Sequence, residues 1–171
     1  MRIFPGKSKL KINVNRQNQN NDIDFKLWRI LDHTGFVITR SRKKELSQYG
    51  LTPEQAHILD ILHHSGGTVT IQGIVAITMR QHHSISTLVD RMAKQGLVNK
   101  VKSASDARQY DVIITEKGQA LFSRTTKNAI TDIFSALSGR EKKELDTGLK
   151  KLRAKAYKLL GMKYQPNVLS E

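Results

Sequence analysis

The apolar residues of this chain recur mainly at three- and four-residue steps, a spacing that places them on one face of an α-helix. The pattern predicts a long first helix over residues 24–49 and a second helix over residues 53–64. Thr52 and Gln55 strengthen the second prediction, because each side chain can accept a hydrogen bond from the backbone N–H of the other residue, as in a capping box. Ser65-Gly-Gly67 then ends this helix.

Residues 84–118 hold the most informative pattern. A stripe of apolar residues at helical spacing predicts a helix whose buried face consists of Ile85, Leu88, Val89 and Met92. Thr70 can cap a short helix that precedes it, and residues 79–81 form the turn between the two. After the second of these helices, two β-rich runs flank a polar turn at 103–108, so we expect a β-hairpin with Arg108 at its tip.

The pattern after the hairpin is helical again. Residues 115–118 are expected to open a helix that continues to about Leu137, and Ser138 with Glu141 forms a second capping box for a final helix that ends at Gly161. Six helices and one hairpin result, with more apolar stripes than the small central module can cover. We therefore expect the outer helices to pack on a second copy of the chain through Phe25, Trp28, Leu145, Leu149, Leu152 and Leu159.

The predicted fold class is mainly α with a small β-hairpin wing, organised as one functional unit. Residues 1–21 are expected to form a basic, flexible arm that could settle on DNA or on a partner subunit. Residues 22–50 form the first dimerisation helix, residues 51–115 a winged helix-turn-helix lobe and residues 116–162 the C-terminal dimerisation helices. Residues 163–171 remain as a tail.

Composition narrows the function classes. Lys and Arg total 29 against 15 acidic residues, and the formal net charge of +14 favours phosphate backbones or anionic membrane surfaces as partners. No apolar run reaches 18 residues and the start lacks a signal-peptide pattern, so we expect a soluble cytoplasmic protein without a membrane partner. The absence of cysteine excludes disulfides, thiolate nucleophiles and cysteine-type zinc sites.

Three motifs carry a resemblance to a known family. Gly96-Leu-Val98, Asp106-Ala-Arg108 and Val112-Ile-Ile-Thr-Glu-Lys-Gly118 stand in the order and spacing that resemble the MarR family (multiple antibiotic resistance regulators), over about residues 24–160. The resemblance implies an obligate dimer with two winged helix-turn-helix lobes. Each lobe would present one recognition helix to the major groove and one wing to the minor groove of double-stranded DNA, at a pseudo-palindromic operator.

The candidate DNA contacts follow from these elements. A narrow minor groove attracts an inserted guanidinium, so Arg108 is expected to enter it, and the resemblance implies that Asp106 pairs with Arg108 and presets its direction. Gln, Ser and Thr side chains near the start of the recognition helix can bind base edges, whereas Arg91 and Lys94 are better placed for phosphates. The full set of expected DNA contacts is Thr70, Arg80, Gln81, His82, His83, Ser84, Ser86, Thr87, Arg91, Lys94, Asp106 and Arg108.

Two ligand hypotheses concern other residues. Histidines are enriched between His57 and His83, and some members of the resembled family sense zinc, but no pair has the i, i+4 spacing that puts two ligands on one helix face, so neither a metal nor a cofactor is expected. The resemblance also implies a cleft for a small aromatic or phenolic effector. Its candidate lining residues are Trp28, His33, Phe36, His57, Ile61 and Phe122.

The sequence thus predicts a dimeric, sequence-specific DNA-binding transcriptional regulator, more specifically a repressor of a promoter near its own gene. An enzyme is not expected, because the chain has no recognisable nucleophile–base pair, phosphate loop or metal-ligand motif. Three alternatives remain open: a nonspecific architectural DNA-binding protein, a metal-responsive member of the same family, and a winged helix that binds protein.

Overall fold

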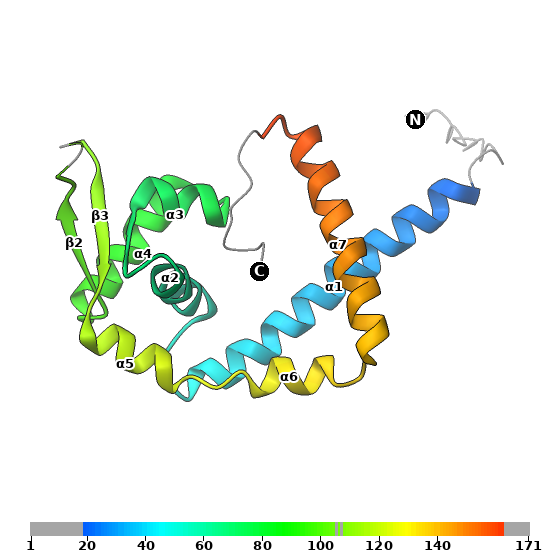
Figure 1. The fold of residues 1–171 in the computed structure, drawn as a ribbon, viewed down its shortest axis with the longest axis horizontal. Helices are drawn as coiled ribbons and strands as arrows, with labels where there is room; N and C mark the ends of the chain where they lie inside the picture. Colours follow the sequence, from blue (N-terminus) through cyan, green and yellow to red (C-terminus); the bar gives the residue numbers. More distant parts are fainter. Residues whose placement is uncertain (1–18, 105, 107, 163–171) are drawn as a thin grey trace, which may run out of the picture. The chain divides into compact units, whose positions relative to one another are not determined.

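The computed structural model describes residues 19–104, 106 and 108–162 (Figure 1). The predicted basic arm lies outside the described residues except for its last three positions, which already belong to the first helix, and the predicted tail at 163–171 lies outside them altogether. The helices and strands, in chain order, are α1 (Gln19–Ser47), α2 (Pro53–His64), β1 (Thr68–Thr70), α3 (Ile71–Thr78), α4 (His82–Lys94), β2 (Val98–Lys102), β3 (Tyr110–Ile114), α5 (Glu116–Arg124), α6 (Asn128–Phe134) and α7 (Gly139–Leu159).

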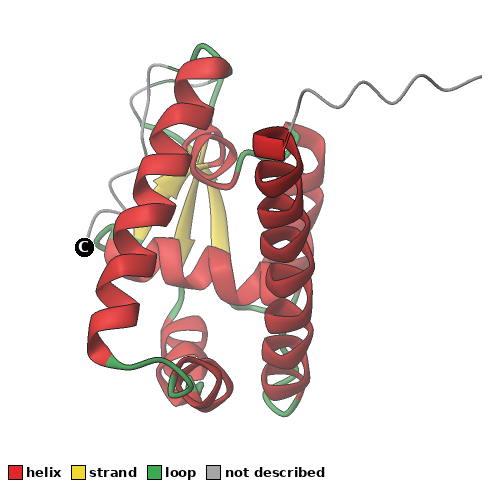
Figure 2. Cartoon of the chain, turned by 90° about the vertical axis from the view of Figure 1, so that its right-hand side faces the viewer, coloured by secondary structure: helices red, strands yellow, loops and turns green. Residues whose placement is uncertain are grey.

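The strands form one small antiparallel sheet in the order β1-β3-β2, and helices make up most of the remaining chain (Figure 2). β2 and β3 are the predicted hairpin, with Lys100 opposite Val112 in its register. β1 was not predicted, because its three residues are too few to display the alternation that identifies a strand. It pairs with the other edge of β3, with Val69 opposite Val112, so the base of the hairpin strand has a neighbour on each side.

The single helix predicted between residues 115 and 137 is in fact two helices. α5 ends at Arg124, Thr125 has an extended backbone, and α6 begins at Asn128. The Thr125 hydroxyl donates to the Phe122 carbonyl at 2.7 Å, and the Thr126 hydroxyl donates to the Glu45 carboxylate at 2.6 Å. The break therefore depends on a contact with a residue 81 positions away, which local periodicity could not reveal.

A hydrophobic core lies among α2, α3, α4 and the sheet. Leu59, Ile74, Val89 and Val112 are each fully buried there. Gly118 brings α5 close to the start of β2, because a Cβ atom at this position would stand 2.1 Å from the Leu97 carbonyl oxygen. The fold therefore requires glycine at that point.

The chain divides into two compact units, up to Val37 and from Ile38 onward, and the boundary falls inside α1. In the first unit the large apolar side chains of α1 are exposed, with Trp28 at 56%. In the second unit α7 also exposes apolar side chains, with Leu152 at 61%. Among the described residues, no helix combines the length and the apolar character that crossing a membrane requires.

Candidate nucleic-acid interface

Two helices joined by a tight turn, α3 and α4, form the centre of the candidate interface. The Thr70 hydroxyl caps α3 as predicted, accepting a hydrogen bond from the Gly73 N–H at 2.9 Å. Met79 ends the helix in the left-handed region at φ 54°, which is uncommon for a residue with a side chain. The chain then turns through Arg80 and Gln81 into α4. The predicted turn at 79–81 and the helix that follows it are therefore confirmed.

α4 separates a buried face from an exposed one. Ile85, Val89 and Met92 are no more than 1% exposed and pack into the core. The predicted DNA-contacting side chains lie on the other face, where His82, His83, Ser84, Thr87, Arg91 and Lys94 are exposed and Ser86 is half-buried. This division leaves the polar face free for a partner.

The hairpin carries the predicted ion pair. Asp106 Oδ1 accepts from the Arg108 Nε at 3.2 Å and from the Arg108 backbone N–H at 3.0 Å, and Asp106 Oδ2 accepts from the Gln109 amide at 3.2 Å. The backbone hydrogen bond, followed by the two side-chain hydrogen bonds, lowers the pKa of Asp106. The Arg108 side chain is nevertheless 91% exposed, so its guanidinium remains accessible to a partner while it contacts Asp106.

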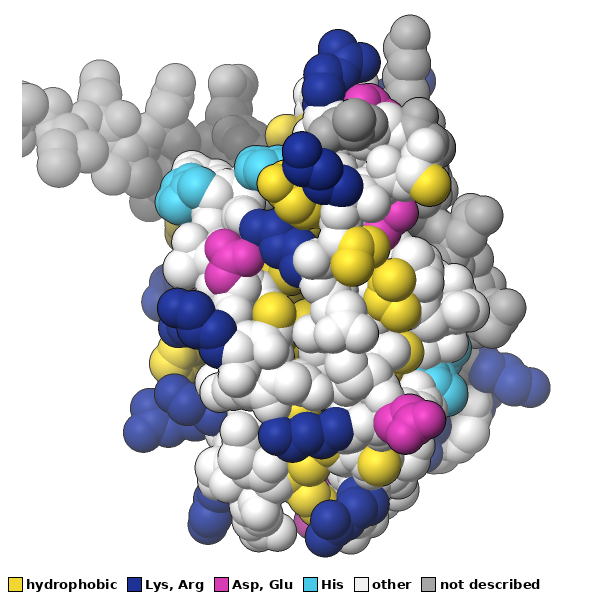
Figure 3. Space-filling view, turned by 90° about the vertical axis from the view of Figure 1, so that its left-hand side faces the viewer, with side chains coloured by type: hydrophobic (Ala, Val, Ile, Leu, Met, Phe, Trp, Pro, Cys, Tyr) yellow, Lys and Arg dark blue, Asp and Glu magenta, His cyan; other side chains and the backbone are white. Residues whose placement is uncertain are grey.

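A hollow of about 360 Å³ lies between the start of α3, the start of α4 and the hairpin. Its walls contain the predicted residues His82, Ser86 and Arg108, together with several that sequence reasoning missed: Ile71, Gln72, Lys100, Gln109 and Tyr110. The alternation of Val98, Lys100 and Lys102 along β2 was the available signal for Lys100, since alternate strand residues share a face. The face of the lobe that carries the hairpin displays more Lys and Arg than acidic side chains (Figure 3).

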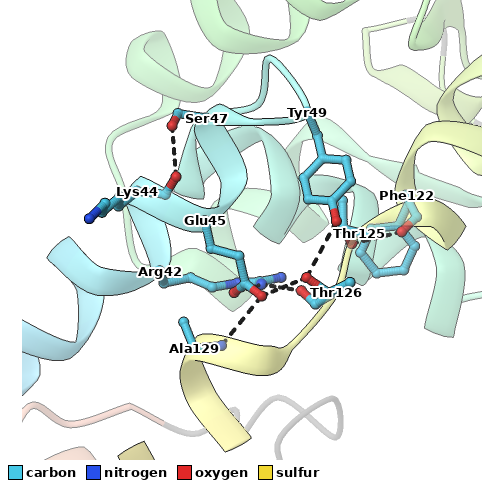
Figure 4. A network of polar contacts seen from close by, with 9 residues as sticks. All are labelled: Arg42, Lys44, Glu45, Ser47, Tyr49, Phe122, Thr125, Thr126 and Ala129. Carbon is cyan, nitrogen blue, oxygen red and sulfur yellow. Dashed lines mark hydrogen bonds and ion pairs between the residues drawn. The ribbon is translucent and has the colours of Figure 1, made fainter. Parts of the chain in front are cut away.

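A second polar cluster ties α1 to the α5–α6 connection within the second unit (Figure 4). Glu45 is only 9% exposed and accepts hydrogen bonds from Arg42 at 2.5 Å, Thr126 at 2.6 Å and the Ala129 N–H at 3.3 Å. Arg42 also donates to the Thr126 carbonyl. Burial alone would raise the pKa of Glu45, but the hydrogen bonds and the Arg42 charge outweigh it, so the pKa lies below the usual value. Sequence reasoning missed this cluster.

The residues predicted to line an effector cleft have different environments. Trp28 and His33 contribute to an open hollow of about 780 Å³ along residues 25–34 of α1, and Phe36 is exposed on the same helix. In the other unit His57 is exposed, but Ile61 is fully buried and Phe122 packs against the core. Ile61 is therefore a core residue, and a single cleft that involves the others stays a prediction.

The histidines of α2 have local partners. His64 Nδ1 lies 2.9 Å from the Asp60 carbonyl oxygen, and the His63 ring lies 5.5 Å from that of Phe122. Within the described part of the chain, no three His, Asp or Glu side chains are grouped closely enough to hold a metal ion.

The order of elements, with a helix-turn-helix followed by an antiparallel hairpin, defines a winged helix-turn-helix protein. The model of the MarR family matches residues 49–109. The HTH-type transcriptional regulator PecS of Dickeya dadantii is 26% identical over 137 residues, covering 75% of this chain and 82% of that protein. In sequence and in fold, the chain is therefore similar to the winged-helix transcriptional regulators of the MarR family.

Two solved structures have the same fold. The organohalide-sensing regulator RdhR, in its 2,4-dichlorophenol-bound form, superimposes with a TM-score of 0.74 at 24% identity, covering 89% of this chain and 92% of that one. A mutant MarR from E. coli, complexed with operator DNA, gives a TM-score of 0.71 at 20% identity, covering 77% of this chain and 96% of that one.

Proposed function

We propose that this regulator is a homodimeric repressor that binds a pseudo-palindromic operator near its own gene. α4 enters the major groove and the β2–β3 hairpin reaches the minor groove of the same duplex. A small aromatic molecule releases the protein from DNA. Residues 51–115 form the DNA-binding lobe in this proposal, and residues 22–50 and 116–162 provide the dimer contacts.

The observation that carries the proposal is the pairing of the exposed polar face of α4 with a preset arginine on the adjacent hairpin. Phosphate contacts supply most of the affinity, while base edges supply the sequence preference. Gln81 directly precedes α4 and Ser84 lies in its first turn. Both are exposed, as a base-reading position requires. Arg108 is 91% exposed and oriented by Asp106, which suits insertion into a narrow minor groove.

The remaining proposed contacts have supporting roles. Arg91 and Lys94 lie in the last turns of α4, are exposed and carry the charge that phosphates attract. Arg80 reaches Glu54 Oε1 at 3.4 Å, an exposed ion pair of little intrinsic value that can exchange for a phosphate. Thr70, Gln81, His82, His83 and Thr87 complete the proposed surface.

Dimerisation is supported by apolar side chains that a single chain leaves in solvent. Phe25 and Trp28 on α1 are more than half exposed, and so are Leu152 and Leu159 on α7. Leu145 and Leu149 are exposed to a lesser degree. Exposed apolar surface of this kind marks association sites, and two-fold dimers are the commonest assembly.

Effector release is supported by the phenolic ligand of RdhR and by the aromatic and cationic side chains of the hollow on α1, which Asp32 also lines. Trp28 offers an apolar wall, and Lys26, Arg29 and His33 offer donors for an anionic group. Such a ligand would have to bind the DNA-incompetent state more tightly than the competent one, because otherwise it shifts no population.

Fluorescence anisotropy with DNA from immediately upstream of the gene tests the proposal. At near-physiological salt, we expect this duplex to bind at least about a thousandfold more tightly than a scrambled duplex of the same length. Equal affinity for both would favour an architectural DNA-binding protein, and no affinity for either would favour a winged helix that binds protein.

A further inference from the structure

Lys100 on β2 joins the hairpin to α4. Its ammonium lies 2.8 Å from Asp90 Oδ1 and 3.3 Å from Ser86 Oγ, and 4.9 Å from the centre of the Tyr110 ring. Its side chain is only 20% exposed, although lysines are mostly exposed in folded proteins. A lysine so placed is held by three partners on two elements.

Asp90 is the partner that requires an explanation. It is the one acidic residue between His82 and Lys94, and it stands four positions after Ser86 on the same face of α4. Its side chain is 51% exposed beside a surface that we assign to DNA. An unpaired carboxylate there would repel phosphates, whereas the Lys100 ammonium neutralises it.

The contact with Lys100 also determines which hydrogen-bonding role the Ser86 hydroxyl can play toward a partner. An ammonium can only donate hydrogen bonds, so the Ser86 hydroxyl oxygen accepts from Lys100 and its own hydrogen is the group that it can donate. Ser86 also lines the hollow beside Arg108. A serine held in this way favours acceptors, which purine N7, guanine O6, thymine O4 and phosphate oxygens provide, over the cytosine amino group.

We propose that Lys100 is a positioning residue for operator recognition, which neutralises Asp90 and presets Ser86 as a hydrogen-bond donor toward DNA. The proposal rests on the DNA-binding function above and adds to it a residue that acts from the hairpin strand through α4. Lys100 thereby couples the shape of the hairpin to the base preference of the helix.

The test uses a duplex that the wild-type dimer selects from a random-sequence pool, with its affinity measured by anisotropy. Lys100→Met removes the charge but keeps an unbranched side chain, and Lys102→Met is the matched control because it removes one charge from the same strand. We expect Lys100→Met to bind about tenfold or more weakly and Lys102→Met to change affinity by less than about threefold. Adding Asp90→Asn to Lys100→Met should restore the affinity to within about threefold of Asp90→Asn alone.

Base preference provides a second measurement, which would not change if Lys100 only stabilised the fold. Competition with single-base-pair variants of the selected duplex should show that Lys100→Met and Ser86→Ala relax the preference at the same positions. Thermal unfolding and light scattering verify that each variant is a folded dimer, and Lys100→Gln replaces Lys100→Met with the same expectations if the latter does not fold.

Three results would overturn the proposal. The first is wild-type affinity in Lys100→Met, and the second is a double variant that stays as weak as Lys100→Met. In the second case, the slope of log affinity against log salt concentration should be compared between Lys100→Met and wild type. A slope smaller by about one in Lys100→Met would mean that Lys100 binds a phosphate directly. The third is a wild-type chain that selects no sequence at all, which contradicts the regulator proposal itself, whereas the first two contradict only the role of Lys100.

Discussion

At the scale of single residues, accessible and buried ion pairs have different consequences. Asp106 and Arg108 form an exposed pair whose value to stability is small, so its main effect is to orient the guanidinium. Glu45 and Arg42 form a pair in which both side chains are mostly covered, at 9% and 18% exposure. Loss of the first pair should affect binding, and loss of the second should affect folding.

Arg108→Ala should weaken operator binding by about 1 to 3 kcal/mol, because one minor-groove contact is lost and Asp106 loses its partner beside DNA. Titration by fluorescence anisotropy measures this loss. Arg124→Ala, which removes a charge at the exposed end of α5, is the control and should leave affinity nearly unchanged. Wild-type affinity in Arg108→Ala would show that the hairpin does not contact the groove.

Glu45→Gln should lower the free energy of unfolding at neutral pH by about 1 to 3 kcal/mol, because Arg42 loses its charged partner. The folded-state pKa of Glu45 lies below its ordinary value of 4.5, so its contribution is fully present above that pH and is lost as the pH falls through the lowered pKa. Denaturant unfolding should therefore give a difference between wild type and variant that shrinks below about pH 4.5. The exposed substitution Glu116→Gln is the control, and a difference independent of pH would contradict the assignment.

At the scale of elements, close packing explains why some positions admit one residue type. Gly118 in the first turn of α5 faces the Leu97 carbonyl oxygen, which belongs to the residue just before β2. The same region is held by the Thr115 hydroxyl, which donates to the Gly96 carbonyl at 2.7 Å and accepts from the Gly118 N–H at 3.0 Å. The hairpin root and α5 are thus joined at one point.

Gly118→Ala should reduce the free energy of unfolding by about 1 to 3 kcal/mol, because the added Cβ cannot be accommodated without moving backbone. The shift of the denaturation midpoint measures this loss. Gly139→Ala at the start of α7 is a matched control, since a Cβ there meets nothing within 4 Å. Equal stability of the two variants would mean that the backbone at Gly118 relaxes freely.

The sequence predicted those elements whose signals are local. The capping boxes at Thr52 and Ser138 are both present, and α2 has the predicted bounds because its start and stop signals directly adjoin its two ends. The pair of Asp106 with Arg108 could also be predicted, since its members are only two positions apart. β1, the break after α5 and the Lys100 contacts were not, because each depends on partners that only the folded chain brings together.

At the scale of the whole molecule, a single chain leaves many large apolar side chains exposed to water, outside its hydrophobic core. Leu152 and Leu159 on α7 are 61% and 76% exposed. Lysines lie between the leucines in the sequence of α7, so the helix has a charged side as well as an apolar one. A second copy of the chain is the occupant that we propose for the apolar side.

Leu152→Glu should raise the dimer dissociation constant by at least about a hundredfold, because an unpaired buried charge costs roughly 3 to 5 kcal/mol. Light scattering at micromolar concentration should then report the monomer mass. Lys151→Glu is the control: it changes the net charge by more than Leu152→Glu does, but at a neighbouring exposed position. It should leave the dimer mass unchanged. A dimer of normal mass in Leu152→Glu would remove α7 from the interface.

The three-stranded sheet has a consequence for how the length of the hairpin could be changed. β1 pairs with β3 only at Asp111–Ile113, so β3 has a neighbouring strand on each side at the root of the hairpin, and the pair of Lys102 with Tyr110 ends the β2–β3 ladder toward the tip. Residues added on the tip side of that pair would leave the β1–β3 register unchanged, and exposed loop positions such as Arg108 tolerate insertion. The reach of the hairpin can therefore change without altering the strand pairing at its root.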